Sequence, residues 1–103
     1  MTRYQLGGLE FAWDDQKAVA NEAKHHVTFL EASTAFLDGF GERISDIDHS
    51  EDEDRFLLLA ASYRLRILVV AHAARSFSIR IISAREATPR ERRRYAETHD
   101  GRR

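Results

Sequence analysis

Cysteine is absent from this chain of 103 residues, and proline occurs once. Without cysteine there are no disulfide bonds, no cysteine-bound zinc and no thiolate nucleophile. Residues 1–10 lack the charged-then-apolar pattern of a secretory signal, and no apolar run approaches the ~20 residues that span a membrane. We therefore expect a soluble, cytoplasmic protein that needs no cofactor.

The net charge of −1 conceals a strong segregation of charge along the chain. Between Ser45 and Asp54 there are six acidic residues and no lysine or arginine, whereas seven arginines accompany four acids from Arg85 to the end. We predict that the acidic segment is a solvated loop. A calcium loop is the alternative, but the spacing does not match an EF-hand and its glycine is missing. We therefore expect no metal site.

Two helices are predicted in the first half of the chain. Asp14 is a suitable N-cap for a helix that runs to about Lys24. Thr28 and Glu31 form a capping box for a second helix, and an apolar stripe at helical spacing follows them. Gly39 is expected to end this second helix as its C-cap.

Extended segments dominate the remainder. They are Leu9–Trp13, Phe40–Ile47, Arg55–Ser62, Leu65–Ala73 and the apolar, β-branched segment that begins at Phe77. Tyr63 and Arg64 are the expected turn of an antiparallel hairpin, although the favoured Asn-Gly pair is absent. Short links between successive strands predict a meander.

The last helix has the clearest start signal in the chain. Thr88 is its N-cap, the single proline, Pro89, takes the first helical position, and Glu91 completes a capping box. Residues 1–97 then form one α+β domain. It has an antiparallel sheet of about four strands, two N-terminal helices and one C-terminal helix, with the helices on one face and the other face open. Residues 98–103 are expected to be a disordered basic tail.

Arg80 and Arg85 lie in the strand before this helix. Their odd separation puts them on opposite faces of an ideal strand, so they can serve one ligand only if a bulge or the strand end intervenes. They are either phosphate ligands or surface arginines with buried stems. Arg85 also precedes a helix N-terminus, which favours an anion.

Lys24, His25 and His26 lie at the junction of the first two helices. Histidine suits proton transfer near neutral pH, and lysine adds positive charge. The plainer interpretation is a solvated helix C-terminus, where basic side chains interact well with the helix dipole.

Several further residues are candidates for contacts with a nucleic acid. They are Arg64 beside the hairpin turn, and Arg90, Arg94 and Tyr95 in the last helix. The guanidinium group matches phosphate oxygens, but a solvated helix face explains these arginines as well. His72, between alanines, is expected to be a satisfied or half-buried histidine rather than a catalytic residue.

The chain resembles the BrnT family of toxins from bacterial type II toxin–antitoxin systems, from about residue 11 to residue 96. The resemblance rests on Phe11, Trp13, Asp14, Lys17, Asn21, Lys24, His25, Val27, Phe29, Glu31, Ala32, Arg55, Phe56, Arg80, Ile82, Ser83, Ala84, Arg85, Glu91, Arg92 and Tyr95. It departs from the family at His26, where glycine is usual. Glycine suits a left-handed C-cap, whereas histidine adopts that conformation at a cost.

The resemblance implies a fold similar to RelE-type ribonucleases and an activity on RNA. It also implies a ribbon-helix-helix antitoxin that neutralises the toxin and binds operator DNA with it. Metal-independent cleavage by the ribose 2′-hydroxyl would use Lys24, His25, Arg80 and Arg85, with Tyr95 as a stacking or proton-donating group. Two alternatives are a non-catalytic co-repressor of the same fold and a DNA-binding protein that acts alone.

Overall fold

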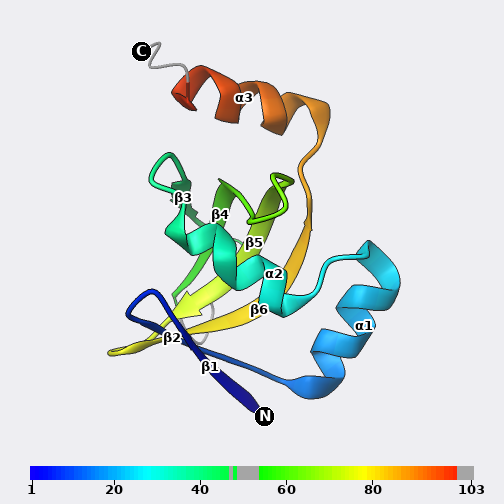
Figure 1. Cartoon of the computed structure of the whole chain (residues 1–103), viewed down its shortest axis with the longest axis vertical. Coiled ribbons are helices and arrows are strands. Elements are labelled where there is room, and N and C mark those ends of the chain that lie inside the picture. Colours follow the sequence, from blue (N-terminus) through cyan, green and yellow to red (C-terminus); the bar gives the residue numbers. More distant parts are fainter. Residues whose placement is uncertain (47, 49–53, 100–103) are drawn as a thin grey trace.

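The computed structural model describes residues 1–46, 48 and 54–99, and it has the expected α+β composition (Figure 1). Its elements are β1 (Thr2–Leu6), β2 (Leu9–Trp13), α1 (Asp15–His25), α2 (Phe29–Thr34), the 3₁₀ turn η1 (Ala35–Leu37), β3 (Glu42–Ser45), β4 (Arg55–Ala61), β5 (Ile67–Ala74), β6 (Ser78–Glu86) and α3 (Pro89–His99). Of the expected acidic loop, residues 47 and 49–53 lie outside the described residues.

One mixed sheet contains the six strands of the described residues, in the order β1-β2-β6-β5-β4-β3. The prediction of about four antiparallel strands was therefore wrong in number, and it was wrong in direction for β2 and β6, which pair in parallel. The sequence did not reveal β1 because this edge strand is exposed at its centre and lacks an apolar alternation. Two consecutive residues with positive φ, Gly7 and Gly8, turn it back to pair with β2.

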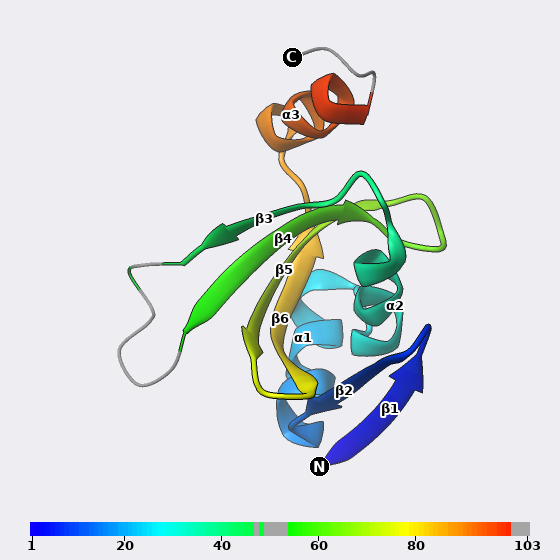
Figure 2. The ribbon, with the colours of Figure 1, turned by 90° about the vertical axis from the view of Figure 1, so that its left-hand side faces the viewer.

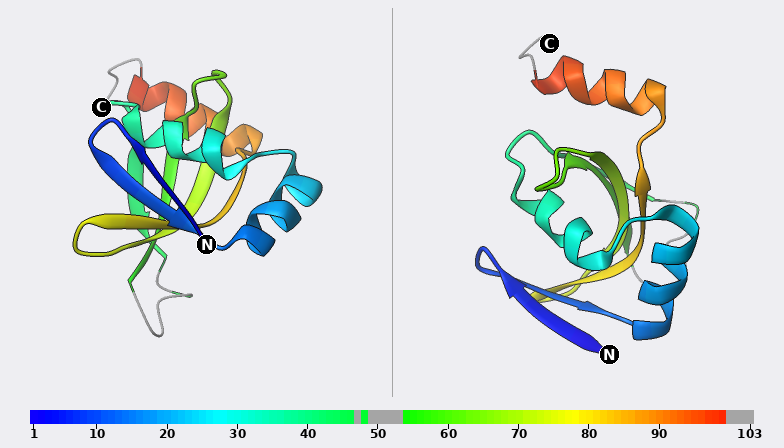
Figure 3. Two further views of the ribbon diagram at one scale, coloured as in Figure 1. Left: turned by 60° about the horizontal axis from the view of Figure 1, so that its bottom comes forward. Right: turned by 45° about the vertical axis from the view of Figure 1, so that its right-hand side comes forward.

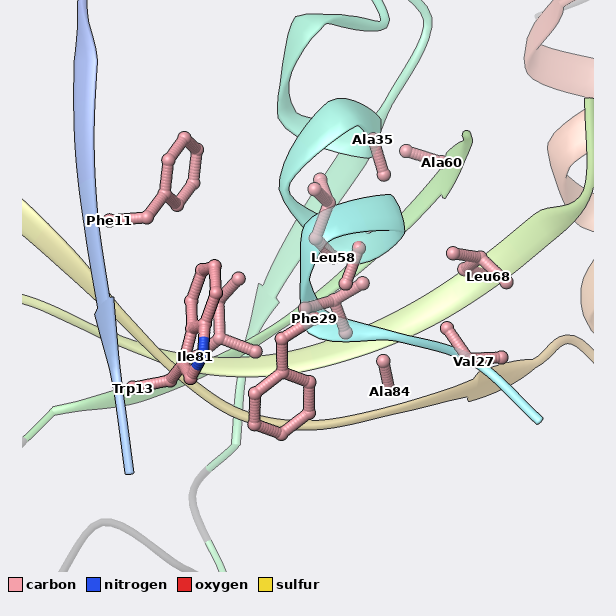
Figure 4. Close-up of a cluster of buried hydrophobic side chains, with 12 residues drawn as sticks. Phe11, Trp13, Val27, Phe29, Ala35, Leu58, Ala60, Leu68, Ile81 and Ala84 are labelled. Carbon is pink, nitrogen blue, oxygen red and sulfur yellow. The ribbon is translucent and has the colours of Figure 1, made fainter. Parts of the chain in front are cut away.

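The hydrophobic core lies between one face of the sheet and helices α1 and α2 (Figure 2). Aromatic side chains from β2 and α2 meet aliphatic side chains from β4, β5 and β6 (Figure 4). The cluster consists of Phe11, Trp13, Val27, Phe29, Ala32, Ala35, Leu58, Ala60, Leu68, Val70, Ile81 and Ala84. His72 is buried beside it, as expected, between the rings of Phe36 and Phe56.

Helix α3 does not lie with α1 and α2 on the core face of the sheet, so the prediction that all helices cover one face was wrong. It lies beyond the C-terminal end of β6, at the opposite end of the molecule from the β1–β2 hairpin (Figure 3). Glu91 and Arg94 of α3 line a cavity with Leu57 and Leu59. Those two leucines alternate with the core residues of β4, so α3 overhangs one end of the second face of the sheet.

The helix starts agree with the sequence, but the end of α2 does not. Asp14 Oδ1 accepts a hydrogen bond from Lys17 N at 3.0 Å, and Thr28 Oγ1 accepts one from Glu31 N at 3.0 Å. The predicted C-cap at Gly39 was wrong, because the helix passes through η1 and ends at Asp38 in an extended conformation. The carboxylate of Asp38 accepts from the backbone of Ala61 at 2.8 Å and thereby holds this exit against β4.

The β4–β5 connection is longer than the two-residue turn predicted from Tyr63 and Arg64. The strands end at Ala61 and resume at Ile67, and Leu65 between them has a φ of 62°. At the C-terminus, α3 extends to His99, so residues 98 and 99 are helical rather than part of a tail. Residues 100–103 of the predicted tail lie outside the described residues.

His26 caps α1 in the left-handed conformation that the family glycine would favour, with φ 59° and ψ 32°. The left-handed conformation destabilises a residue that has a β-carbon by roughly 1–2 kcal/mol, and glycine avoids this strain. Glycine also loses more conformational entropy on folding, which offsets part of the gain. We predict that His26→Gly raises the free energy of unfolding by about 0.5–1 kcal/mol in urea denaturation.

The neighbouring residue supplies the control for this substitution. His25 is the last residue of α1, where glycine lowers stability by about 1 kcal/mol. Opposite signs for the two adjacent substitutions are therefore expected. Destabilisation by both would mean that the left-handed cap carries no strain.

Candidate functional site

A bulge in β6 brings Arg80 and Arg85 to the same face of the sheet. Ala71 of β5 pairs with Ser83, whereas the next residue, His72, pairs with Ile81. Ile82 is therefore an extra residue on β6, and it reverses the alternation of faces. This bulge satisfies the condition under which the two arginines can serve one ligand.

The face on which they lie is the one opposite the core, and we call it the open face. Side chains that pair across the sheet share a face, so the register places the open-face residues in rows. The rows are Arg85, Val69, Leu59 and Glu42; then Ser83, Ala71, Leu57 and Ile44; then Arg80, Ala73 and Arg55. The first and third rows are about 13 Å apart at the backbone, a distance that two long arginine side chains can narrow.

Arg85 is held by Glu91 of α3 in a bidentate ion pair. Its two terminal nitrogens donate to the two carboxylate oxygens at 2.9 and 3.1 Å. The same carboxylate accepts from Thr88 N at 2.8 Å, which completes the predicted capping box. The hydrogen bonds from Arg85 lower the pKa of Glu91 to about 2. The Arg85 side chain remains 41% exposed, so an anion from solvent can reach the guanidinium group.

The buried side chain of Asn21 attaches helix α1 to β6, next to Arg85. Its amide donates to Ala84 O at 2.9 Å and accepts from Ala84 N at 3.0 Å. Strand β2 pairs with β6 only from Ser78 to Arg80, so Asn21 takes the place of a neighbouring strand at Ala84. Lys24 and His25, three and four residues after Asn21, share its side of the helix. Because Asn21 contacts Ala84, this spacing predicts that Lys24 and His25 lie toward the part of β6 that carries Ser83 and Arg85.

The remaining sequence candidates do not all join this site. Arg64 lies in a separate hollow between α1, the start of α2 and the β4–β5 turn, 3.8 Å from the carboxylate of Glu31. Arg90 is exposed in the first turn of α3. Arg94 donates to both carboxylate oxygens of Glu42 at 2.8 and 2.7 Å, across one end of the open face.

Tyr95 is buried, and its hydroxyl donates to Asp38 Oδ2 at 2.6 Å. Burial, followed by the interaction with Asp38, raises the pKa of Tyr95 to about 12. In this position the residue anchors α3 to the exit of α2. Its predicted contact with RNA would require α3 to move, and it stays a prediction.

The acidic residues of the site were not among the residues predicted from the sequence. Glu91 was predicted as a capping residue and as part of the family resemblance, and Glu42 had no predicted role, yet they pair with Arg85 and Arg94. The capping box contained the signal for Glu91, because it places this carboxylate at Thr88, close in the chain to Arg85. No local pattern indicates Glu42, which lies far from Arg94 in sequence.

Among the described residues, no three histidine, aspartate or glutamate side chains are grouped so that they could hold a metal ion. None of the described helices is long and apolar enough to cross a membrane.

Comparison with known proteins gives a match to a protein family. No curated protein is detectably similar to the chain. A family model described as the ribonuclease toxin BrnT of type II toxin–antitoxin systems matches residues 13–91. The matched segment runs from the end of β2 into the first turn of α3 and includes Lys24, His25, Arg80 and Arg85. Since it covers most of the sequence, the chain belongs to the BrnT family of ribonuclease toxins of type II toxin–antitoxin systems.

Proposed function

We propose that this chain is an endoribonuclease that cleaves mRNA in the cytoplasm at the α3 end of the open face, without a metal ion. The observation that carries the proposal is the bulge at Ile82, which turns Arg80 and Arg85 to one face. The attachment of α1 to Ala84 supports it, because the helical spacing then predicts that Lys24 and His25 lie toward the same part of β6.

The reaction that suits these groups begins at the ribose of the substrate. The 2′-oxygen attacks the adjacent phosphorus while a base removes its proton, and the bond from phosphorus to the 5′-oxygen breaks. An acid returns a proton to the leaving 5′-oxygen, so the products are a 2′,3′-cyclic phosphate and a 5′-hydroxyl. Lys24 and His25 serve proton transfer or charge, and Arg80 and Arg85 stabilise the phosphorane.

Glu91 fits this proposal as the resident partner of Arg85. A carboxylate that binds both guanidinium nitrogens orients the fork as two phosphate oxygens would. An entering phosphate therefore exchanges one anion for another and finds the guanidinium group already positioned. The exposed side of Arg85 is the side from which this exchange starts.

The same ion pair also favours a second candidate function. If the ion pair with Glu91 is permanent, Arg85 only anchors α3 and does not bind a phosphate. The chain would then be a non-catalytic partner of its antitoxin and a co-repressor. The two functions differ in whether loss of Arg85 abolishes RNA cleavage or only loosens α3.

A type II toxin has an antitoxin partner, and we propose that this partner has a ribbon-helix-helix domain that binds operator DNA. We further propose that one of its segments covers the open face. Arginines from β4, β6 and α3 border that face, so an acidic segment would match its charge.

The first prediction here concerns Arg85→Ala. A donor aimed at developing charge affects the rate more than binding, so cleavage of RNA should fall on the order of 100-fold. The variant should still fold and bind antitoxin, because Tyr95 and Arg94 continue to attach α3. Cleavage assays, thermal unfolding and co-purification measure these three properties.

Arg93→Ala is the matched control, since Arg93 is an exposed arginine of the same helix. Arg92 is less suitable because it donates to Ala87 O at 2.9 Å, in the link between β6 and α3. The control should cleave RNA within a few-fold of the wild type. Wild-type activity in purified Arg85→Ala would remove Arg85 from the catalytic residues.

A second prediction concerns the chemistry of cleavage. Attack by the 2′-oxygen needs that oxygen at the cleaved nucleotide and no divalent ion. The rate should therefore be unchanged in excess EDTA, whereas a substrate with a single 2′-deoxy substitution at the cut should resist cleavage. Dependence on added magnesium, or cleavage of the deoxy substrate, would contradict the mechanism.

A third prediction concerns the antitoxin. Expression of the chain alone should arrest growth, and co-expression with the small reading frame beside its gene should restore it. The restored cells should yield a stable complex in which the open face is protected from hydrogen exchange, because the partner covers it. Recovery of growth without a physical complex would contradict direct inhibition.

A further inference from the structure

We propose that a cavity on the open face binds the base of the nucleotide beside the cleaved phosphate and prefers guanine. This inference rests on the proposed ribonuclease function and names the part of the substrate that the same face would select.

The cavity lies between the sheet and α3 and has a volume of about 110 Å³. Its floor is aliphatic, and its rim consists of charged groups. The floor residues are Ile44, Leu57, Leu59 and Val69, and the rim residues are Glu42, Glu91 and Arg94. An enclosed apolar cavity of about 150 Å³ accommodates a benzene-sized ring. A slightly smaller cavity with an open side therefore suits the flat face of one base, with the rest of the nucleotide outside.

The position of the cavity relative to Arg85 matches the layout of a nucleotide. Arg85, Val69, Leu59 and Glu42 form one row across four adjacent strands. Adjacent strands are about 4.8 Å apart, so roughly 14 Å separates the two ends of this row at the backbone. A phosphate held at Arg85 thus places its own ribose and base over Val69 and Leu59, with the far edge of the base toward Glu42.

The rim supplies the hydrogen bonds that would distinguish one base from another. The carboxylate of Glu42 accepts two parallel hydrogen bonds from Arg94 in the free protein. The Watson–Crick edge of guanine carries two adjacent donors, N1–H and the N2 amino group, and can replace those two bonds. Adenine, cytosine and uracil place an acceptor beside their donor on that edge, so an acceptor-only carboxylate meets them less well.

Arg94 would remain useful after the exchange. Its side chain is 58% exposed, so the guanidinium plane can leave Glu42 and lie over the base. Stacking between arginine and a base is a common feature of single-stranded RNA recognition. A base thereby uses the aliphatic floor, the carboxylate and the guanidinium group together.

An aliphatic side chain of the antitoxin is the competing occupant, and the rim argues against it. Such a side chain would fill the floor but offer no hydrogen bonds to the charged groups that it shields from water. The rim groups pair with one another in the free protein, so such a side chain would desolvate these ion pairs without adding a hydrogen bond, and desolvation of an ion pair is unfavourable. A base packs against the aliphatic floor and also forms hydrogen bonds with the charged rim, and we therefore assign the cavity to RNA.

The test compares the cut sites of wild type, Glu42→Gln and Arg94→Gln by sequencing the ends of a randomised RNA after partial digestion. Both variants break the ion pair between Glu42 and Arg94, but only Glu42→Gln removes the carboxylate acceptor. We expect guanine to be enriched at one nucleotide flanking the wild-type cut. Glu42→Gln should reduce this preference about tenfold, the order expected for one bidentate base contact. Arg94→Gln should cut more slowly but keep the preference.

Methyl NMR of the full chain tests the cavity without cleavage. Guanosine 5′-monophosphate should shift the methyl signals of Leu57, Leu59 and Val69, and adenosine 5′-monophosphate should shift them much less. The shifts should be lost in Glu42→Gln and retained in Arg94→Gln.

The outcomes separate this inference from the ribonuclease proposal. RNA cleavage with no base preference, or with the same preference in Glu42→Gln, overturns the inference and leaves the proposed function intact. Absence of cleavage defeats the proposed function, and the nucleotide titration then decides whether the cavity binds a base. Methyl shifts caused by the antitoxin but by neither nucleotide make the cavity a protein-docking site and overturn the inference.

Discussion

The ion pair between Glu31 and Arg66 is the interaction on which the other parts of the structure depend. Glu31 is 3% exposed; it accepts from Arg66 Nε at 2.9 Å, from Arg66 Nη2, and from Ser62 Oγ at 2.7 Å. Arg66 also donates to His26 O at 2.9 Å and pairs with Glu86. One guanidinium group thus joins the end of α1, the start of α2, the β4–β5 turn and the end of β6. The hydrogen bonds from Arg66 lower the pKa of Glu31. A buried carboxylate left alone there would cost about 3–5 kcal/mol.

Ion pairs attach α3 to the rest of the molecule in a different way. Arg85 with Glu91 and Arg94 with Glu42 are both bidentate, but these side chains are much more exposed than the carboxylate of Glu31. Water and incoming anions compete with exposed pairs, so such pairs exchange partners at little cost. The protein therefore combines a protected ion pair that maintains the fold with accessible ones at the site where RNA is proposed to bind.

Local signals predicted some elements correctly and could not predict others. The capping boxes at Thr28 and Thr88 depend on residues a few positions apart, and their N-cap hydrogen bonds are present. At Thr28, however, the glutamate of the box turns to Arg66, because a buried ion pair outweighs a solvent-exposed capping bond. The exit of α2 was mispredicted because Asp38 accepts hydrogen bonds from residues distant in the chain, the backbone of β4 and the hydroxyl of Tyr95.

Sequence by itself determined the local features of this protein. These are the helix starts, the apolar strands, the buried stripe of α2 and the cationic groups near β6. Each depends on neighbouring residues or on a regular period. Only the tertiary structure decided which cations share a face, because the bulge at Ile82 follows from the pairing of β6 with β5. It also decided that Glu42 lies opposite Arg94 and that Asn21 closes the edge of β6. Such contacts join residues far apart in the chain, so no local pattern reveals them.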